Sequence, residues 1–573
     1  MRIDPQWLAN RRTTWIFVAV FAIAYGFALY THHAWEDYYI TYRCSKNLAT
    51  GQGLVFTPGE RVHAFTSPLN TLIPAALSFA TGNYSDRMVL WMFRMISCAC
   101  LAGGAVFLYR IARAQSLGRL ATFTWIGMYA TLPGVVDYSI NGQETGLMMF
   151  FLAMALESLL VPGRRVGLRM GLAWAGLMWT RPDSCVYIAA IAGTFLFFNA
   201  GSSTHPTRLG LVKTYLVAGS VTAALYAPWV VWAWSYFGSP VPHTVIAKGL
   251  YHSYRFPDLW QKTLSFLGEV FSAKFIAMSG TFAPPYSGFP EWPHWMFTGC
   301  GMLAWIASLY WLLPFGRRQT RALSFVFLLG LWYVAVIVPM PFPWYLPNTA
   351  IFGVCVLGQL VEQVAAILRR LGEWELGGGR LAALRDRALG CARLAHRAIA
   401  VSIPAFTLMM LVLCAMQMRV QQRVIERGNR MRIGLWLREN ARSPKDTVFL
   451  EPLGYIGYYS QLKMLDWPGL CSPEVVAVRR KTTAWSKMIA ELRPDWLVFR
   501  PNEVSLMKGE DPRMINEDYV AVKVFDVSAR LQACGWIPGR CYPMGDQTFT
   551  VFRRRDAKTD GPRVASVAER SRP

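Results

Sequence analysis

Long apolar runs separated by short polar stretches make up most of roughly the first 420 residues. A helix needs about 17–25 apolar residues to cross the hydrocarbon core of a bilayer, and about eleven runs approach or reach that length. The two runs that flank Arg181-Pro182-Asp183 are short and have the length of half-helices that meet at a break. The predicted spans are Trp15–Tyr30, Met88–Tyr109, Leu120–Val136, Leu147–Val161, Gly167–Thr180, Cys185–Phe198, Leu211–Trp234, Trp295–Leu313, Leu323–Val338, Leu346–Leu368 and Ala398–Met418.

The pattern changes after Met418 to short runs rich in β-branched and aromatic residues. These runs are DTVFLEPLGYIGYYSQLKMLD, RPDWLVFR, YVAVKVFDV and TFTVFRRR, and they predict strands, with a helix over Leu453–Ser460 between the first two. We therefore expect a transmembrane domain over residues 1–428 with its first outside loop at 32–87, a small α/β domain over 429–555, and a disordered polar tail over 556–573.

Composition places the chain among membrane proteins. Its residues are 54% hydrophobic and only 16% charged, whereas about a quarter of an ordinary soluble protein is charged. The net charge of +24 raises nucleic acid as a partner, but the basic residues lie mainly in short clusters between the apolar runs, as in cytoplasmic loops. No nucleic-acid-binding signature accompanies them, so we expect no nucleic-acid partner.

The basic clusters orient the predicted spans, because short cytoplasmic loops carry an excess of Lys and Arg. With the amino terminus inside, the clusters fall on one side, and the other side receives residues 36–87, 137–144, 237–294 and 340–345. The number of spans is odd, so the predicted α/β domain is also expected outside. The apolar stretch Leu69–Ala80 is too short for a span and is predicted to be an interfacial helix.

An acidic pair, Glu36-Asp37, follows directly on the first predicted span. Unpaired carboxylates are costly at a membrane boundary, so such a pair indicates a function or a partner, although a solvated helix end is the simpler alternative. The same outside loop also holds bases and cations, which together favour a site for an anionic substrate. They are His32, His33, Arg43, Lys46, Arg61 and His63.

Four other outside turns supply matching side chains. Glu144 comes from the turn NGQETGL, and Arg181 and Asp183 come from WTRPDS. His243 and Lys248 come from YFGSPVPHTVIAKGL, and Trp344 and Tyr345 come from PMPFPWYLP. The alternatives are an acid favoured by a helix dipole for the first turn, an internal ion pair for the second and an aromatic belt for the fourth. A lysine suits phosphate because its ammonium is a compact point charge.

Motifs for nucleotide hydrolysis, dinucleotide redox chemistry and zinc proteolysis do not occur in the sequence. An enzyme that faces outward also lacks a nucleotide supply, so an activated group would have to arrive on a membrane lipid; a lipid-linked phosphate fits. Cys534 and Cys541 fall on the predicted outside, which is oxidising. A disulfide between them and two reduced buried thiols are equally consistent with the sequence.

The loop WEDYYITYRCSKNLATGQGLVFTPGERVHAFTSPLNTL resembles the first outside loop of GT-C glycosyltransferases, in the branch of the terminal arabinofuranosyltransferases. Five further stretches resemble later blocks of the same group. They are NGQETGL, TRPD, YFGSPVPHTVIAKG, PFPWYL and LEPLGYIGYYSQLKMLDWPGLCSPEV. The sequence departs from the family pattern at Glu36, where the family has the first aspartate, and at His63, where it has a glutamate.

The resemblance implies a GT-C fold in a bacterial plasma membrane, with the site facing outward. The implied donor is a sugar on a polyprenyl phosphate, arabinofuranose above all, and the acceptor is a hydroxyl of an envelope glycan, a glycolipid or a surface protein. A divalent metal bridging carboxylate and phosphate is compatible with these residues but not required by them. A transporter or flippase of lipid-linked saccharides is the alternative, but it should carry polar residues near the bilayer midplane.

The resemblance also implies a role for each candidate residue, as a base, as a phosphate ligand or as a support for the acceptor. Asp37 is the expected base, assisted or oriented by Glu36. The expected phosphate ligands, in falling order, are Lys248, His243, Arg181 and Arg61, with Tyr345 beside the donor; the expected acceptor or supporting residues are His63, Glu144, Asp183 and Trp344.

Overall fold

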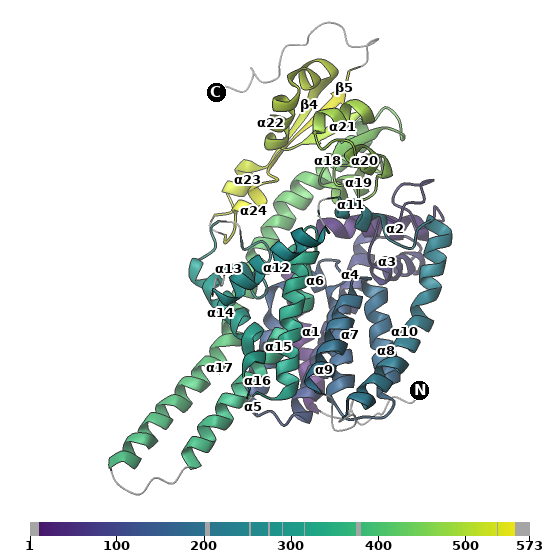
Figure 1. The fold of residues 1–573 in the computed structure, drawn as a ribbon. Coiled ribbons are helices and arrows are strands. Elements are labelled where there is room, and N and C mark those ends of the chain that lie inside the picture. The colour runs from purple at the N-terminus through teal and green to yellow at the C-terminus, as the bar shows by residue number, and fades with distance from the viewer. Residues whose placement is uncertain are drawn as a thin grey trace.

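The structure is a computed structural model that describes residues 11–200, 207–250, 252, 254–272, 276–288, 290–314, 316–373, 380–535 and 537–555. The predicted polar tail, 556–573, lies outside the described residues. The described chain forms a helical body with a five-stranded sheet at one end and a helical hairpin at the other (Figure 1).

The helices of the body hold most of the predicted spans. They are α1 (Arg11–Thr31), α2 (Glu36–Ala49), α3 (Pro68–Ala80), α4 (Asp86–Ala114), α5 (Arg119–Thr131), α6 (Pro133–Ile140), α7 (Thr145–Leu160), α8 (Val166–Thr180), α9 (Ser184–Phe198), α10 (Arg208–Phe237), α11 (His243–Gly249), α12 (Phe256–Phe271), α13 (Ile276–Ser279), α14 (His294–Leu309), η2 (Tyr310–Leu312), α15 (Arg318–Trp332), η3 (Tyr333–Ile337), η4 (Pro343–Tyr345), α16 (Leu346–Glu373), α17 (Arg380–Val420) and η5 (Gln421–Arg430).

Seven helical stretches of the described chain are long and apolar enough to cross a membrane. They are Arg11–Thr31, Asp86–Ala114, Arg208–Phe237, His294–Leu312, Arg318–Ile337, Pro343–Glu373 and Ala383–Asn440. The other four predicted spans coincide with α5, α7, α8 and α9, which are shorter than this criterion requires, so the predicted number of eleven spans is not confirmed.

The prediction of one continuous span over Leu120–Val136 is wrong. Helix α5 ends at Thr131, Leu132 is extended with ψ 116°, and α6 begins at Pro133. Proline lacks the backbone N–H that would continue the helix and keeps the residue before it out of the helical region. The proline in this run was therefore a sufficient signal for the break.

The predicted boundary at residue 428 falls inside continuous helical backbone. Helix α17 passes through η5 into α18 (Met431–Asn440), so one long helix joins the body to the sheet (Figure 1). The side chain of Asn429 donates hydrogen bonds to the main-chain oxygens of Asp546 and Gln547, at 2.9 and 3.2 Å, which ties this helix to the strand region.

Each of the predicted β-rich runs contains at least one strand. The strands are β1 (Thr447–Leu450), β2 (Lys463–Asp466), β3 (Trp496–Phe499), β4 (Tyr519–Asp526) and β5 (Thr548–Arg554), in the sheet order β2-β1-β3-β5-β4. Strand β1 is parallel to β2 and β3, and β5 is antiparallel to β3 and β4. The remaining helices are α19 (Leu453–Ser460), α20 (Pro473–Arg479), α21 (Trp485–Leu492), α22 (Pro501–Glu510), η6 (Met514–Asp518), α23 (Ser528–Gln532) and α24 (Cys541–Met544).

Both faces of the sheet are buried at β1 and β3, whereas most of the edge strand β4 is exposed. Successive strand residues point to opposite faces, so Phe449 packs with the apolar side of α21, whereas Val448 packs with α18 and with Phe56 of the first loop. The loop after α2 is thus part of the same core as the sheet. Cys534 and Cys541 are both free thiols in this structure, which has no disulfide between them.

Arg43 joins helix α2 to the sheet region. Its guanidinium is 1% exposed and donates hydrogen bonds to the main-chain oxygens of Gly457, Leu462 and Gln461, at 2.8, 3.0 and 3.1 Å. It also lies 4.3 Å from the centre of the Phe56 ring.

We expect Arg43→Met to lower the free energy of unfolding by about 2 kcal/mol, because it leaves buried carbonyl groups without a charged donor. Thermal unfolding of the purified protein in detergent measures this loss. Arg432→Met, at an exposed position of α18, is the matched control and should leave the midpoint unchanged. Equal midpoints for the two variants would show that Arg43 does not hold the sheet to the body.

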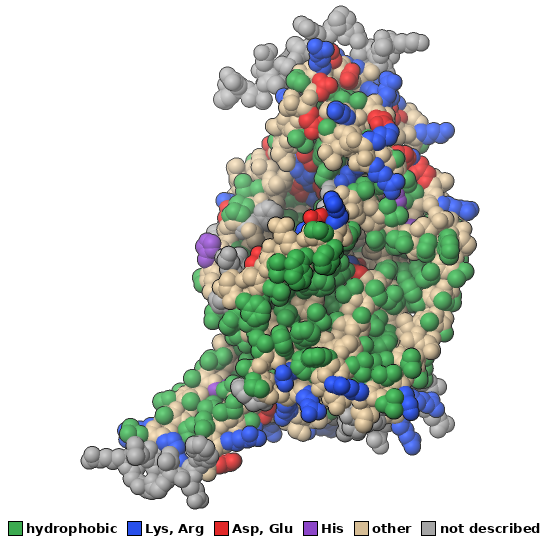
Figure 2. All heavy atoms as spheres, viewed as in Figure 1, with side chains coloured by type: hydrophobic (Ala, Val, Ile, Leu, Met, Phe, Trp, Pro, Cys, Tyr) green, Lys and Arg blue, Asp and Glu red, His purple; other side chains and the backbone are tan. Residues whose placement is uncertain are grey.

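Charge and apolar surface are separated along the molecule. Figure 2 shows apolar side chains over the middle of one face, Lys and Arg gathered at the end opposite the sheet, and charged residues of both signs over the sheet. An apolar middle between charged ends is the distribution expected of a protein that crosses a bilayer.

Candidate active site

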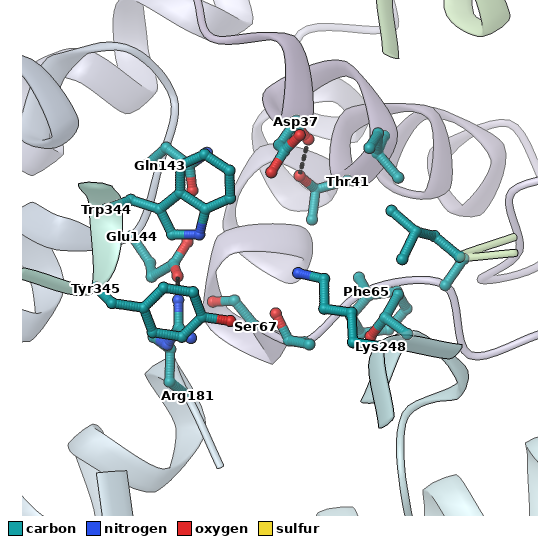
Figure 3. A pocket seen from close by; sticks show the side chains of 15 residues that line it. Asp37, Thr41, Phe65, Ser67, Gln143, Glu144, Arg181, Lys248, Trp344 and Tyr345 are labelled. Atoms are coloured by element: carbon teal, nitrogen blue, oxygen red, sulfur yellow. Dashed lines mark hydrogen bonds and ion pairs between the residues drawn. The ribbon is translucent and has the colours of Figure 1, made fainter. Parts of the chain in front are cut away.

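A cavity lies where the helical body meets the sheet region (Figure 3). Its walls come from the start of α2, the loop before α3, the turns before α7 and α9, helix α11, η4 and the segment after β2. The lining residues are Asp37, Ile40, Thr41, Ala64, Phe65, Thr66, Ser67, Gln143, Glu144, Arg181, Thr244, Lys248, Trp344, Tyr345 and Leu470.

Asp37 occupies the first turn of α2. The helix begins after Trp35, which is extended with ψ 154°, and the positive end of the helix dipole favours an acid here. The hydroxyl of Thr41 donates a hydrogen bond of 3.0 Å to the main-chain oxygen of Asp37. Burial raises the pKa of the Asp37 carboxyl to about 6, although the Lys248 cation lowers it. The carboxyl is therefore suited to accept a proton near neutral pH.

Lys248 reaches the same cavity from the short helix α11. Figure 3 shows its ammonium pointing toward the middle of the cavity, below Asp37. Its Nζ lies 5.7 Å from the centre of the Phe342 ring, and no carboxylate of the described chain forms an ion pair with it. Lys248 is thus a cation that faces the cavity without an acidic partner.

Arg181 is a cation of the cavity wall that two carboxylates already hold. Its guanidinium bonds Glu144 at 2.7 Å and Asp183 at 2.9 and 3.0 Å, and Asp183 also accepts a hydrogen bond of 3.2 Å from the hydroxyl of Tyr333. The ring of Tyr345 lies 4.6 Å from the Arg181 guanidinium carbon. The internal ion pair considered for this turn is present, and Arg181 positions Glu144 and Tyr345 at the cavity.

Five predicted site residues do not line the cavity, and one of them, Asp183, is the partner of Arg181 described above. Glu36 accepts a hydrogen bond from the backbone N–H of Gly454, so it faces α19; Arg61 is exposed, with its guanidinium 4.9 Å from the Tyr236 ring. His63 is buried and stacks on Phe237 at 4.4 Å, and burial lowers its pKa to about 4.

The fifth residue, His243, donates its backbone N–H to the oxygen of His63 at 2.9 Å, and its side chain is not part of the cavity wall. The reason is helical geometry. Residues 36 and 37 point about 100° apart on α2, and 243 and 248 point about 140° apart on α11, so the two members of each pair have different surroundings.

Sequence reasoning missed several polar residues of the wall. Thr41 is one helical turn after Asp37, and Gln143 and Thr244 each adjoin a residue that was singled out. Ser67 caps α3 by accepting a hydrogen bond of 3.2 Å from the N–H of Asn70. Helical spacing and the neighbouring motifs were usable signals for these residues. Among the described residues, no group of three or more His, Cys, Asp or Glu is arranged to hold a metal ion.

The chain has curated relatives with an assigned activity. It is 26% identical over 237 residues to the terminal β-(1→2)-arabinofuranosyltransferase of Corynebacterium glutamicum, which covers 37% of this chain and 32% of that protein. It is 27% identical over 263 residues to the enzyme of the same name from Mycobacterium tuberculosis, with 42% of this chain and 38% of that protein covered. The alignments thus span about a third of the length of these relatives.

Two further comparisons concern the fold and the sheet region. The crystal structure of ArnT from Cupriavidus metallidurans in the apo state aligns with a TM-score of 0.51 at 12% identity, over 97% of this chain and 100% of that chain, a likeness of fold alone. Residues 417–552 match the family described as Domain of unknown function (DUF8728).

These likenesses define a class of protein. Seven helical stretches of the described chain are long and apolar enough to cross a membrane, and its fold is like that of ArnT. In sequence it resembles the terminal arabinofuranosyltransferases, as the loop after the first predicted span indicated.

Proposed function

We propose that this protein is a membrane glycosyltransferase that moves a sugar from a polyprenyl-phosphate donor to a hydroxyl group. The observation that carries the proposal is the pairing of Asp37 with Lys248, a carboxyl of raised pKa and a cation without an acidic partner, on the wall of one cavity. The names of its relatives make arabinofuranose the sugar that we propose. The acceptor is then an envelope glycan, a glycolipid or a surface protein.

The two side chains divide the chemistry between them. The acceptor oxygen bonds to the anomeric carbon while the bond from that carbon to the phosphate oxygen breaks. The carboxylate of Asp37 takes the proton of the acceptor hydroxyl, and the ammonium of Lys248 stabilises the charge that grows on the leaving phosphate. Glu144 and Tyr345, held by Arg181, are proposed to orient the sugar.

Apolar surface beside the cavity supports a lipid donor. Helix α12 exposes Phe256, Trp260 and Leu264, whose four-residue spacing puts them on one face. A second, mostly apolar cavity lies between α12 and α15 and includes Leu346, which directly follows Tyr345. A polyprenyl chain lying there would bring its phosphate to the part of the cavity wall that Tyr345 forms.

The basic end of the molecule supports an orientation. Lys and Arg gather at the end opposite the sheet (Figure 2), and cytoplasmic ends of membrane helices carry this excess. We propose that the cavity and residues 429–555 face the outside of a bacterial plasma membrane, where no nucleotide-sugar donor is supplied.

A donor panel tests the proposal. The purified protein is given an envelope arabinan or an oligosaccharide acceptor together with polyprenyl-phosphate arabinofuranose, other polyprenyl-phosphate sugars or soluble nucleotide sugars, and the products are analysed by mass spectrometry. Extension of the acceptor by one pentose, from the lipid-linked donor alone, is the expected result. Transfer from a nucleotide sugar, or from no donor in the panel, would contradict the proposed function.

The rate of transfer should follow the ionisation of Asp37. The base must be deprotonated, so with a pKa of about 6 the rate should fall about tenfold per pH unit below pH 6 and level off above it. The Lys248 cation lowers this pKa, so Lys248→Met should move the acid limb to higher pH. Arg61→Met, at an exposed position, is the control and should leave the limb in place. A pH-independent rate between pH 5 and pH 7 would remove Asp37 as the base.

A further inference from the structure

A large cavity lies at the opposite end of the body from the candidate site, between α1, α4 and α5. Apolar side chains such as Trp15, Ile23 and Ala130 form most of its wall. Three arginines, Arg12, Arg113 and Arg119, also line it. We call this cavity the α1–α5 groove.

The groove has the length of one bilayer leaflet. Its lining on α1 runs from Arg12 to Ile23, which is about 16 Å of helix. Half of a hydrocarbon core about 30 Å thick is nearly the same length. Arg12 begins this stretch and the residues that follow it in the wall are apolar, so the groove leads from a charged end into the membrane.

The charged end of the groove presents exposed arginines. Arg110, one turn before Arg113, forms an ion pair of 3.0 Å with Glu157. Within the described chain, by contrast, neither Arg113 nor Arg119 has a carboxylate partner. Glu362 contacts the turn before Arg119, where it accepts the N–H of Gly118 at 2.7 Å, but its ion pair is with Arg369, at 2.8 Å.

We propose that the α1–α5 groove binds one anionic glycerophospholipid. The phosphate of the headgroup bonds Arg113 and Arg119, and an acyl chain lies along α1 from Trp15 toward Ile23. Arginine suits this role because its planar fork can bond two phosphate oxygens at once. The inference depends on the chain crossing a membrane and not on sugar transfer.

Native mass spectrometry of the full chain in detergent tests the headgroup. The protein is titrated with phosphatidylglycerol and with phosphatidylcholine that carries the same acyl chains. We expect tighter binding of phosphatidylglycerol, and a loss of about 30-fold in that affinity when Arg113→Gln and Arg119→Gln are combined. Arg164→Gln with Lys213→Gln removes the same charge from other exposed positions and should change the affinity by less than about twofold, because distant charges are screened.

A second pair of variants tests the acyl chain. Ala19 lines the groove, so Ala19→Phe should fill it and weaken binding of phosphatidylglycerol, whereas Val18→Phe, at the neighbouring exposed position outside the lining, should not. Equal binding of the two lipids, an equal loss in the two double variants, or an unchanged affinity in Ala19→Phe would each overturn the proposal. Unchanged thermal midpoints show that the variants are folded.

Discussion

Asp37→Asn is expected to lower the rate of sugar transfer on the order of 10³- to 10⁴-fold, because the amide cannot accept the proton of the acceptor hydroxyl. The side chain keeps its size and lies at the cavity wall, so the acceptor and the donor should still bind. The initial rate of transfer at saturating donor, measured at pH 7.5 or above, gives this loss directly.

The same substitution should not cost stability. Burial raises the pKa of the Asp37 carboxyl above its ordinary value, so the folded state favours the protonated form, and the stability that this group contributes is present at acid pH and lost as the pH rises through about 6. Above pH 7 the charged carboxylate therefore disfavours folding, and Asn removes that charge. We expect the thermal midpoint of Asp37→Asn to equal or exceed that of the natural protein at pH 7.5.

Glu36→Gln is the matched control, because it neutralises the adjacent carboxylate. Glu36 faces Gly454 and not the cavity, and an amide oxygen can still accept that backbone N–H. The rate should stay within about fivefold of the natural protein, since no proton transfer is lost. A larger loss in Glu36→Gln than in Asp37→Asn would assign the base to Glu36.

Lys248→Met should lower the rate of transfer about 10²- to 10³-fold, the cost of removing one donor that stabilises growing negative charge. Methionine keeps much of the length and the apolar character of the lysine stem, so the contact with Phe342 is preserved. Because the lost interaction strengthens as the phosphate leaves, the loss should appear mainly in kcat rather than in KM.

Arg61→Met is compared with Lys248→Met, because both residues were expected to bind the phosphate. Arg61 shares the first loop with Asp37 but stacks on Tyr236 outside the cavity, so its loss should leave kcat within about twofold, as for a distant surface charge. If Arg61→Met lowers kcat as much as Lys248→Met does, the phosphate is bound outside the cavity described here.

Most of the residues that meet at the cavity were predictable because they lie in turns that adjoin apolar helices. Glu144, Arg181, Lys248 and Tyr345 are far apart in sequence, but the orientation rule for basic loops puts their turns on one side of the bundle. Placement on one side does not fix where a side chain points. His63 was expected at the site because it shares a loop with Asp37, yet it stacks on Phe237, since loop conformation decides its direction.

A single sequence does not predict which distant segments contact one another. Leu470 reaches the cavity from the segment after β2, and Arg43 meets carbonyl groups more than 400 residues later in the chain. Neither position has a local pattern that identifies its partner. The break before Pro133 was different, because the rule for proline predicts it and the length of the apolar run outweighed that rule.

The central claim is that the Asp37–Lys248 cavity cleaves the bond between a sugar and a lipid phosphate. The most direct measurement uses proteoliposomes that contain a doubly labelled polyprenyl-phosphate sugar and an enclosed or external acceptor, with free polyprenyl phosphate and extended acceptor quantified together. We predict that the two products appear in equal amounts and that both are lost in Asp37→Asn. Movement of the intact lipid-linked sugar across the bilayer without release of polyprenyl phosphate would contradict the claim and identify a flippase.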